Sequence, residues 1–87
     1  MFDIVKRRCG IASNVTVYDD DILLYMEDCK ADMMASGVSE AVFACCTPEV
    51  ITAVTFYVKA HLGDDRSDTE EYMDLYRKKV FRLTLWG

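Results

Sequence analysis

Hydrophobic residues recur every three or four positions along most of the chain, which is the spacing of one face of an α-helix. Glycine, proline and short polar residues stand where these periodic segments begin and end. The pattern predicts four helices, over residues 2–9, 19–36, 48–62 and 67–86. We therefore expect an all-α fold, a small four-helix bundle.

The second predicted helix begins near Asp19 or Asp20, whose carboxylates can cap free backbone amides, and stops before Gly37. Its hydrophobic residues are predicted to form one buried face: Ile22, Leu23, Met26, Cys29 and Met33. The connection that follows, residues 37–47, is apolar for a loop. Two options stay open for its Phe43, which either returns to the core or contacts a neighbouring subunit.

Two local preferences disagree in the third predicted helix. Its many β-branched residues favour a strand, whereas Thr47, Pro48 and Glu49 are a typical helix start. We favour the helix, because roughly 15 residues up to Gly63 are too many for a typical strand of about 5 or 6. The width of its apolar surface predicts that this helix lies centrally, with one buried stripe: Ile51, Val54, Val58 and Leu62.

The fourth predicted helix has a capping box at its start, Ser67 with Glu70 or Asp68 with Glu71. Five residues at helical spacing are predicted to face the core: Tyr72, Leu75, Tyr76, Val80 and Leu83. Phe81, Leu85 and Trp86 fall partly outside this stripe, where large apolar groups are costly unless something covers them. We expect a subunit or partner contact there.

The length and charge of the chain restrict its function. The 87 residues suffice for one modest core, so we expect a single domain over residues 1–87. A net charge of −5 disfavours general nucleic-acid binding. The basic triplet Lys6, Arg7 and Arg8 is interpreted as a solvated helix end.

The sequence has no apolar run long enough to cross a membrane, and its N-terminal residues do not have the order of a signal peptide. We therefore expect a protein kept inside a cell or inside a particle assembled there.

The residues that could bind a metal or take part in catalysis do not follow the spacing of a known metal or catalytic motif. The cysteines have no Cys-x-x-Cys spacing and His61 is the only histidine, so we expect no zinc and no other metal or cofactor. Cys9 and Cys29 are expected to be small, reduced, buried residues. Without an organised nucleophile and base, we expect no enzyme. A helix-turn-helix DNA binder is a weaker reading, because the start of the last helix, where base-reading residues usually lie, is acidic.

Several short motifs follow one another in an order typical of one protein family. They are Tyr18-Asp19-Asp20-Asp21, Lys30-Ala31-Asp32, Ser36-Gly37-Val38, Pro48, Tyr57-Val58-Lys59-Ala60-His61-Leu62-Gly63 and Glu71-Tyr72. With these motifs the chain resembles the head-tail connector proteins, or neck adaptors, of long-tailed bacteriophages. The apolar segment from Phe43 to Cys46 departs from the more polar connection expected in that family.

The resemblance implies a virion neck protein, assembled in the host bacterial cytoplasm, that forms a ring, implied to be a dodecamer, under the portal protein. Such a ring extends the DNA channel and joins the filled head to stopper or tail proteins, with DNA only as passing cargo and no membrane. Under this hypothesis the interface residues are Phe43, Phe81, Arg82, Leu85 and Trp86, and the residues at the channel or its rim are Asp19, Asp20, Asp64 and Asp65. The alternative is a small acidic helical protein-interaction module, such as a regulator or an antitoxin-like factor.

Overall fold

The structure is a computed structural model that describes residues 1–62 and 66–85, without the side chains of residues 66–68. Every regular element in these ranges is a helix, which confirms the all-α prediction. The helices are α1 (Phe2–Arg8), α2 (Asp19–Ala35), α3 (Glu40–Ala44), α4 (Pro48–Leu62) and α5 (Arg66–Thr84). Four of them correspond to the predicted helices, and the short α3 is an addition within the connection that follows α2.

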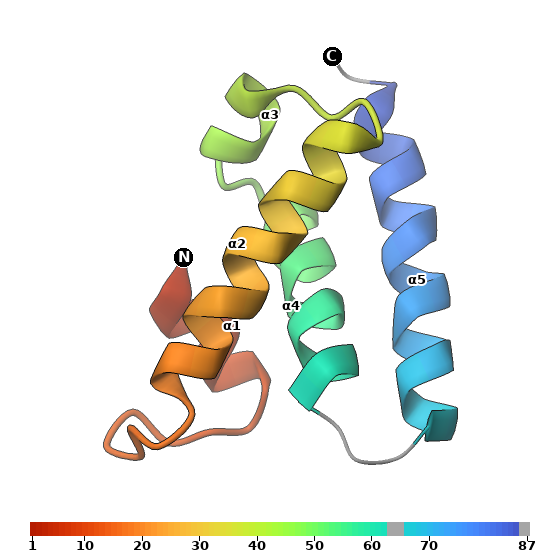
Figure 1. The fold of residues 1–87 in the computed structure, drawn as a ribbon. Helices are drawn as coiled ribbons and strands as arrows, with labels where there is room; N and C mark the ends of the chain where they lie inside the picture. The colour runs from red at the N-terminus through yellow and green to blue at the C-terminus, as the bar shows by residue number, and fades with distance from the viewer. Residues whose placement is uncertain (63–65, 86–87) are drawn as a thin grey trace.

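Helix α4 lies at the centre of the fold, as predicted, and packs against α1, α2 and α5 (Figure 1). The backbone N–H of Val50 donates to Thr47 Oγ1 at 3.4 Å, so threonine caps this helix. The hydroxyl of the buried Thr55 donates to the carbonyl oxygen of Ile51 at 2.7 Å. Capping and burial therefore override the strand preference of the β-branched residues.

The hydrophobic core is formed where α1, α2 and α5 meet α4. Its buried members are Val5, Ile22, Cys29, Met33, Val38, Val50, Ala53, Val54, Val58, Tyr76, Val80 and Leu83. Leu23 was predicted to share the buried face of α2, but 47% of its surface is exposed. One residue is about 100° around a helix, so the residue after the buried Ile22 is turned away from α4.

Helix α3 determines the position of Phe43. The Ser39 hydroxyl accepts a hydrogen bond from the backbone N–H of Val42 at 3.2 Å and so caps this helix. Phe43 is half-buried and packs against the core, with Lys30 Nζ 5.8 Å from the centre of its ring. Of the two options for Phe43, return to the core is the one observed within the single chain.

The contact between α1 and α2 corrects two predictions. The residue at the N-cap of α2 is Tyr18, with no side-chain hydrogen bond, so neither Asp19 nor Asp20 caps this helix. Instead Asp19 Oδ1 lies 2.7 Å from Lys6 Nζ. Lys6 is only 4% exposed and also donates to the carbonyl oxygen of Ser13 at 3.2 Å, so it does not face solvent at the end of α1. The packing of α1 on α2 buries its charge, which the aspartate balances.

Candidate interaction surfaces

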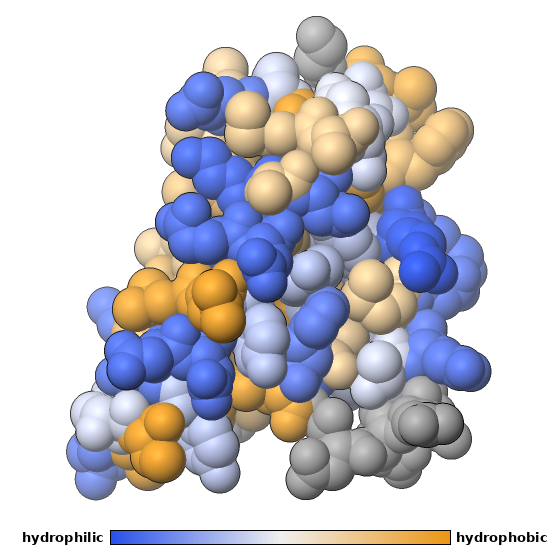
Figure 2. Space-filling view, viewed as in Figure 1, coloured by the Kyte–Doolittle hydropathy of each residue, from blue (hydrophilic) through white to orange (hydrophobic). Residues whose placement is uncertain are grey.

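Helix α5 has one face against α4 and an outward face with exposed hydrophobic residues. Tyr76, Val80 and Leu83 are buried, whereas Phe81 is 67% and Leu85 is 73% exposed. Hydrophobic side chains are visible on the surface at the C-terminal end of α5 (Figure 2). The prediction that these two residues lie outside the core is thus confirmed.

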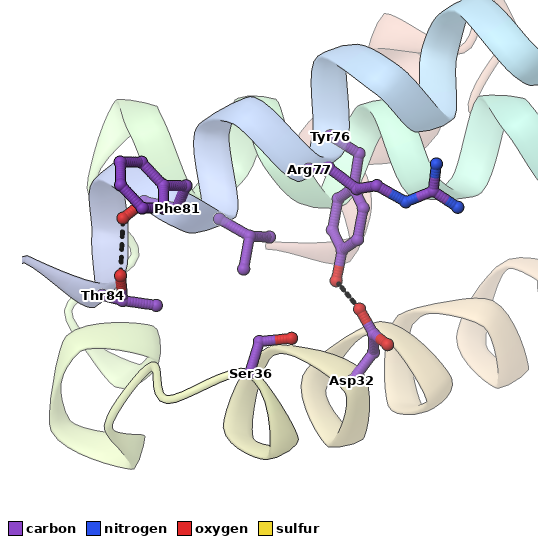
Figure 3. A pocket seen from close by; sticks show the side chains of 7 residues that line it. Asp32, Ser36, Tyr76, Arg77, Phe81 and Thr84 are labelled. Carbon is purple, nitrogen blue, oxygen red and sulfur yellow. Dashed lines mark hydrogen bonds between the residues drawn. The ribbon is translucent and has the colours of Figure 1, made fainter.

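A groove of about 250 Å³ runs between the C-terminal halves of α2 and α5. Its lining residues are Asp32, Ser36, Tyr76, Arg77, Val80, Phe81 and Thr84. Figure 3 shows Asp32 and Ser36 on one side and Arg77 and Phe81 on the other. The Tyr76 hydroxyl crosses the groove and donates to Asp32 Oδ2 at 2.7 Å, which joins the two helices.

Beneath this groove, the buried Cys29 and Tyr76 form a polar pair. Cys29 Sγ lies 3.8 Å from the Tyr76 hydroxyl oxygen, to which the thiol donates. Burial, more than any other cause, raises the pKa of Cys29 to about 12. Burial is also the main cause that raises the pKa of Tyr76, followed by the charge interaction with Cys29. Both groups therefore stay protonated at neutral pH, so Cys29 is not an activated nucleophile and Tyr76 is not a base.

The remaining predicted interface residues have different surroundings. Arg82 is exposed and its Nη2 lies 3.8 Å from Glu49 Oε1, an ion pair between α5 and α4. Phe43, on α3, is half-buried against the core, as described above. Trp86 lies outside the described residues. Three of the predicted interface residues are therefore exposed: Phe81 and Arg82 in the last turn of α5, and Leu85 directly after the helix.

The four aspartates predicted for a channel also differ from one another. Asp19 is half-buried in its ion pair with Lys6, whereas Asp20 is exposed in the first turn of α2. Asp64 and Asp65 lie outside the described residues. Of the aspartates that can be compared, Asp20 is the one whose charge faces solvent.

The structure also describes the surroundings of the remaining histidine and cysteine side chains. The exposed His61 uses Nδ1 to bond the carbonyl oxygen of Tyr57 at 2.8 Å, and its ring stacks on that of Tyr57. Cys45 and Cys46 are exposed free thiols. Among residues 1–62 and 66–85, no group of three or more histidine, cysteine or acidic side chains is placed to hold a metal ion. Within the same ranges, no helix is both long enough and apolar enough to span a bilayer.

Sequence reasoning missed two features that the structure brings out. The first is the buried Lys6, which carried no signal in the sequence because the ion pair depends on how α1 packs against α2. The second is the exposed Leu24, which is 58% exposed on α2. Helical spacing could have identified Leu24, because it lies on the side of α2 opposite to the core positions Ile22 and Cys29.

Comparison with protein families gives one finding. A family model described as phage connector protein matches residues 1–86, nearly the whole chain. Comparison with curated proteins and with solved structures gave no significant match.

Proposed function

Because this chain belongs to the phage connector protein family, we propose that it acts in the neck of a long-tailed phage, as a ring docked under the portal vertex. The family membership itself indicates a structural component of the virion. The ring, implied to be a dodecamer, extends the DNA channel and presents a surface to the stopper or tail proteins. Connector proteins are structural, which favours an assembly role over catalysis.

The observation that carries this proposal is the extent of the family match, residues 1–86. A match to one motif would support only a shared local structure, whereas a match of this length includes all five helices. The proposal also agrees with the protonated state of Cys29 and Tyr76, which suits a structural groove better than a reactive one.

The subunit interface is proposed to include Phe43, Phe81, Arg82, Leu85 and Trp86. Phe81 and Leu85 support this assignment, because both are large apolar side chains left exposed by the single chain. Fully covering one such side chain contributes about 1.5–3 kcal/mol. A ring offers this gain to every copy, since each subunit has two neighbours.

The channel or its rim is proposed to include Asp19, Asp20, Asp64 and Asp65. The net charge of −5 supports a conduit that does not bind DNA tightly, because phosphate binding depends on lysine and arginine. Asp20 is the described residue of this set whose charge faces solvent, while Asp19 is balanced by Lys6. We therefore expect Asp20 to contribute more to the channel potential than Asp19.

The test is co-sedimentation with the portal ring of the same phage, followed by negative-stain imaging. We expect an added annular layer on the portal, and the number of copies in that layer would test the dodecamer. An unrelated portal provides the control for non-specific binding. Failure to bind a matched, intact portal would contradict the proposed function.

A further inference from the structure

Helix α2 has an exposed leucine surrounded by acidic side chains. Leu24 is 58% exposed. Two acidic residues lie three and four positions before Leu24, and two more lie three and four positions after it. All four are exposed: Asp20, Asp21, Glu27 and Asp28. Residues at these spacings are neighbours on a helix surface, so the four carboxylates flank Leu24. We call these five residues the acidic patch.

Helix α5 has exposed hydrophobic and basic residues at similar spacings, and one of the basic residues, Lys78, also pairs with Asp74 at 3.1 Å between Nζ and Oδ2. Phe81 is 67% exposed, and Arg77 and Lys78 lie four and three positions before it, both exposed. Leu85, four positions after Phe81, is 73% exposed and extends the apolar centre. We call Arg77, Lys78, Phe81 and Leu85 the basic patch.

The two patches lie in different parts of one molecule. The acidic patch begins at the N-terminal end of α2 and the basic patch reaches the C-terminal end of α5, and these two helix ends lie at opposite ends of the fold (Figure 1). Figure 2 shows hydrophobic side chains interrupting the hydrophilic surface over the N-terminal half of α2. The patches therefore do not cover each other within a chain, and both are open to other molecules.

From this complementarity we propose that the acidic patch of one copy packs against the basic patch of a second copy, with Leu24 beside Phe81. Each patch repels a copy of itself, because like charges placed opposite each other are unfavourable. Each therefore pairs with the other patch, and the apolar centres supply affinity while the charged rims set orientation. Contacts between two different surfaces of the same chain can repeat around a closed ring. This contact rests on the proposed ring and identifies the surfaces that join its subunits.

The test reverses charge on one patch at a time. The first variant carries Glu27→Lys and Asp28→Lys, and the second carries Arg77→Glu and Lys78→Glu. We expect each variant alone to lose self-association by about tenfold or more. In the first variant the acidic patch, with two aspartates and two lysines, no longer has a net charge opposite to the basic patch, and in the second variant both patches are acidic. A mixture of the two variants has complementary pairs again and should associate.

A matched control reverses two acids outside both patches, with Glu70→Lys and Glu71→Lys, which are exposed on the first half of α5. This control has the same charge change as the first variant and should associate like the unmodified chain. Circular dichroism should show that every variant is folded. Association is measured by sedimentation velocity for the free chains, and by counting copies per portal ring for chains assembled on the portal.

The outcomes separate this contact from the proposed function. Single-patch variants that assemble normally would overturn the contact, as would an unmodified chain that associates neither alone nor on the portal. Variants that lose portal binding and are not rescued by mixing would also overturn it, and would assign the patches to the portal. Patch-dependent association without portal binding would support the contact and contradict the neck function. Self-association that stops at a dimer, and that is lost when either patch is changed, would support the contact and contradict the ring.

Discussion

Helices α4 and α5 pack against each other, yet their hydrophobic residues point in different directions. In α4, Val50, Ala53, Val54 and Val58 are completely buried. In α5, one face is buried through Tyr76 and Leu83, while Phe81 and Leu85 remain exposed. The hydrophobic residues of α4 therefore stabilise the single chain, whereas part of those at the end of α5 remain open to contact with another molecule.

The largest expected effect comes from placing the same charge in each helix. Val54→Asp puts an unpaired carboxylate in a fully buried position, which should cost about 4 kcal/mol or more and unfold so small a domain. Phe81→Asp puts the carboxylate at a position open to water and should change stability by about 0.5 kcal/mol or less. Thermal and urea unfolding followed by circular dichroism measure both.

Either variant could also contradict the assignment of α4 to the core and of Phe81 to the exposed surface. If Val54→Asp folds with normal stability, α4 is not the centre of the core. If Phe81→Asp unfolds the chain, Phe81 belongs to the fold and is not available for a partner.

A second pair makes the comparison at the C-terminal end of α5. Leu83, in the last turn of this helix, is fully buried, whereas Leu85, directly after the helix, is 73% exposed. Leu83→Ala should cost about 3 kcal/mol, since it removes buried methyl groups and leaves a cavity. Leu85→Ala should leave stability within about 0.5 kcal/mol. Equal losses in urea unfolding would contradict the assignment of two different faces to α5.

Much of this fold could be predicted from the sequence, because its helix ends carry local signals. Thr47 and Pro48 begin α4, and Gly37, with a φ of 106° that favours glycine, follows α2. Helix α3 was missed because five residues are too few to show a hydrophobic period. The burial of Lys6 was missed for another reason, since its partner Asp19 lies on a different helix and no local pattern relates the two.

The candidate surfaces were predicted only in part. Phe81 and Leu85 could be identified because they break the hydrophobic period of α5. The acidic patch was missed because Asp20 was interpreted as a helix cap and a channel residue, and not as part of a surface on α2. A binding surface depends on a second molecule, and the helical pattern of one chain contains information mainly about its own core.

The alkaline stability of the chain should reflect the buried contact between α2 and α5, where Cys29 lies beside Tyr76. The pKa of Cys29 is raised from 9.0 to about 12, so its thiol remains protonated in the folded state over a range in which the unfolded thiol ionises. Its contribution is therefore complete below pH 9 and is lost as the pH rises toward 12. In that window the free energy of unfolding should fall by up to about 1.4 kcal/mol per pH unit for this group.

Cys29→Ser isolates that contribution, because the serine hydroxyl can still donate to Tyr76 but does not titrate in this range. Urea unfolding at several pH values from 8 to 11 should show a shallower loss of stability for the variant than for the unmodified chain. Identical slopes would mean that the thiol is open to solvent in the folded protein. Cys45→Ser, at an exposed position, is the matched control for the removal of one thiol.

The smallest expected effect separates the stabilising role of α5 from its assembly role. Tyr76→Phe removes the hydroxyl that donates to Asp32 at 2.7 Å and accepts from Cys29, and should cost about 1 kcal/mol. Tyr18→Phe, at an exposed tyrosine, should be neutral. At a temperature where both variants are folded, neither should alter association with other copies, whereas Phe81→Ala should weaken association and leave stability unchanged. A Tyr76→Phe variant that assembles poorly while fully folded would show that the groove between α2 and α5 itself receives the partner.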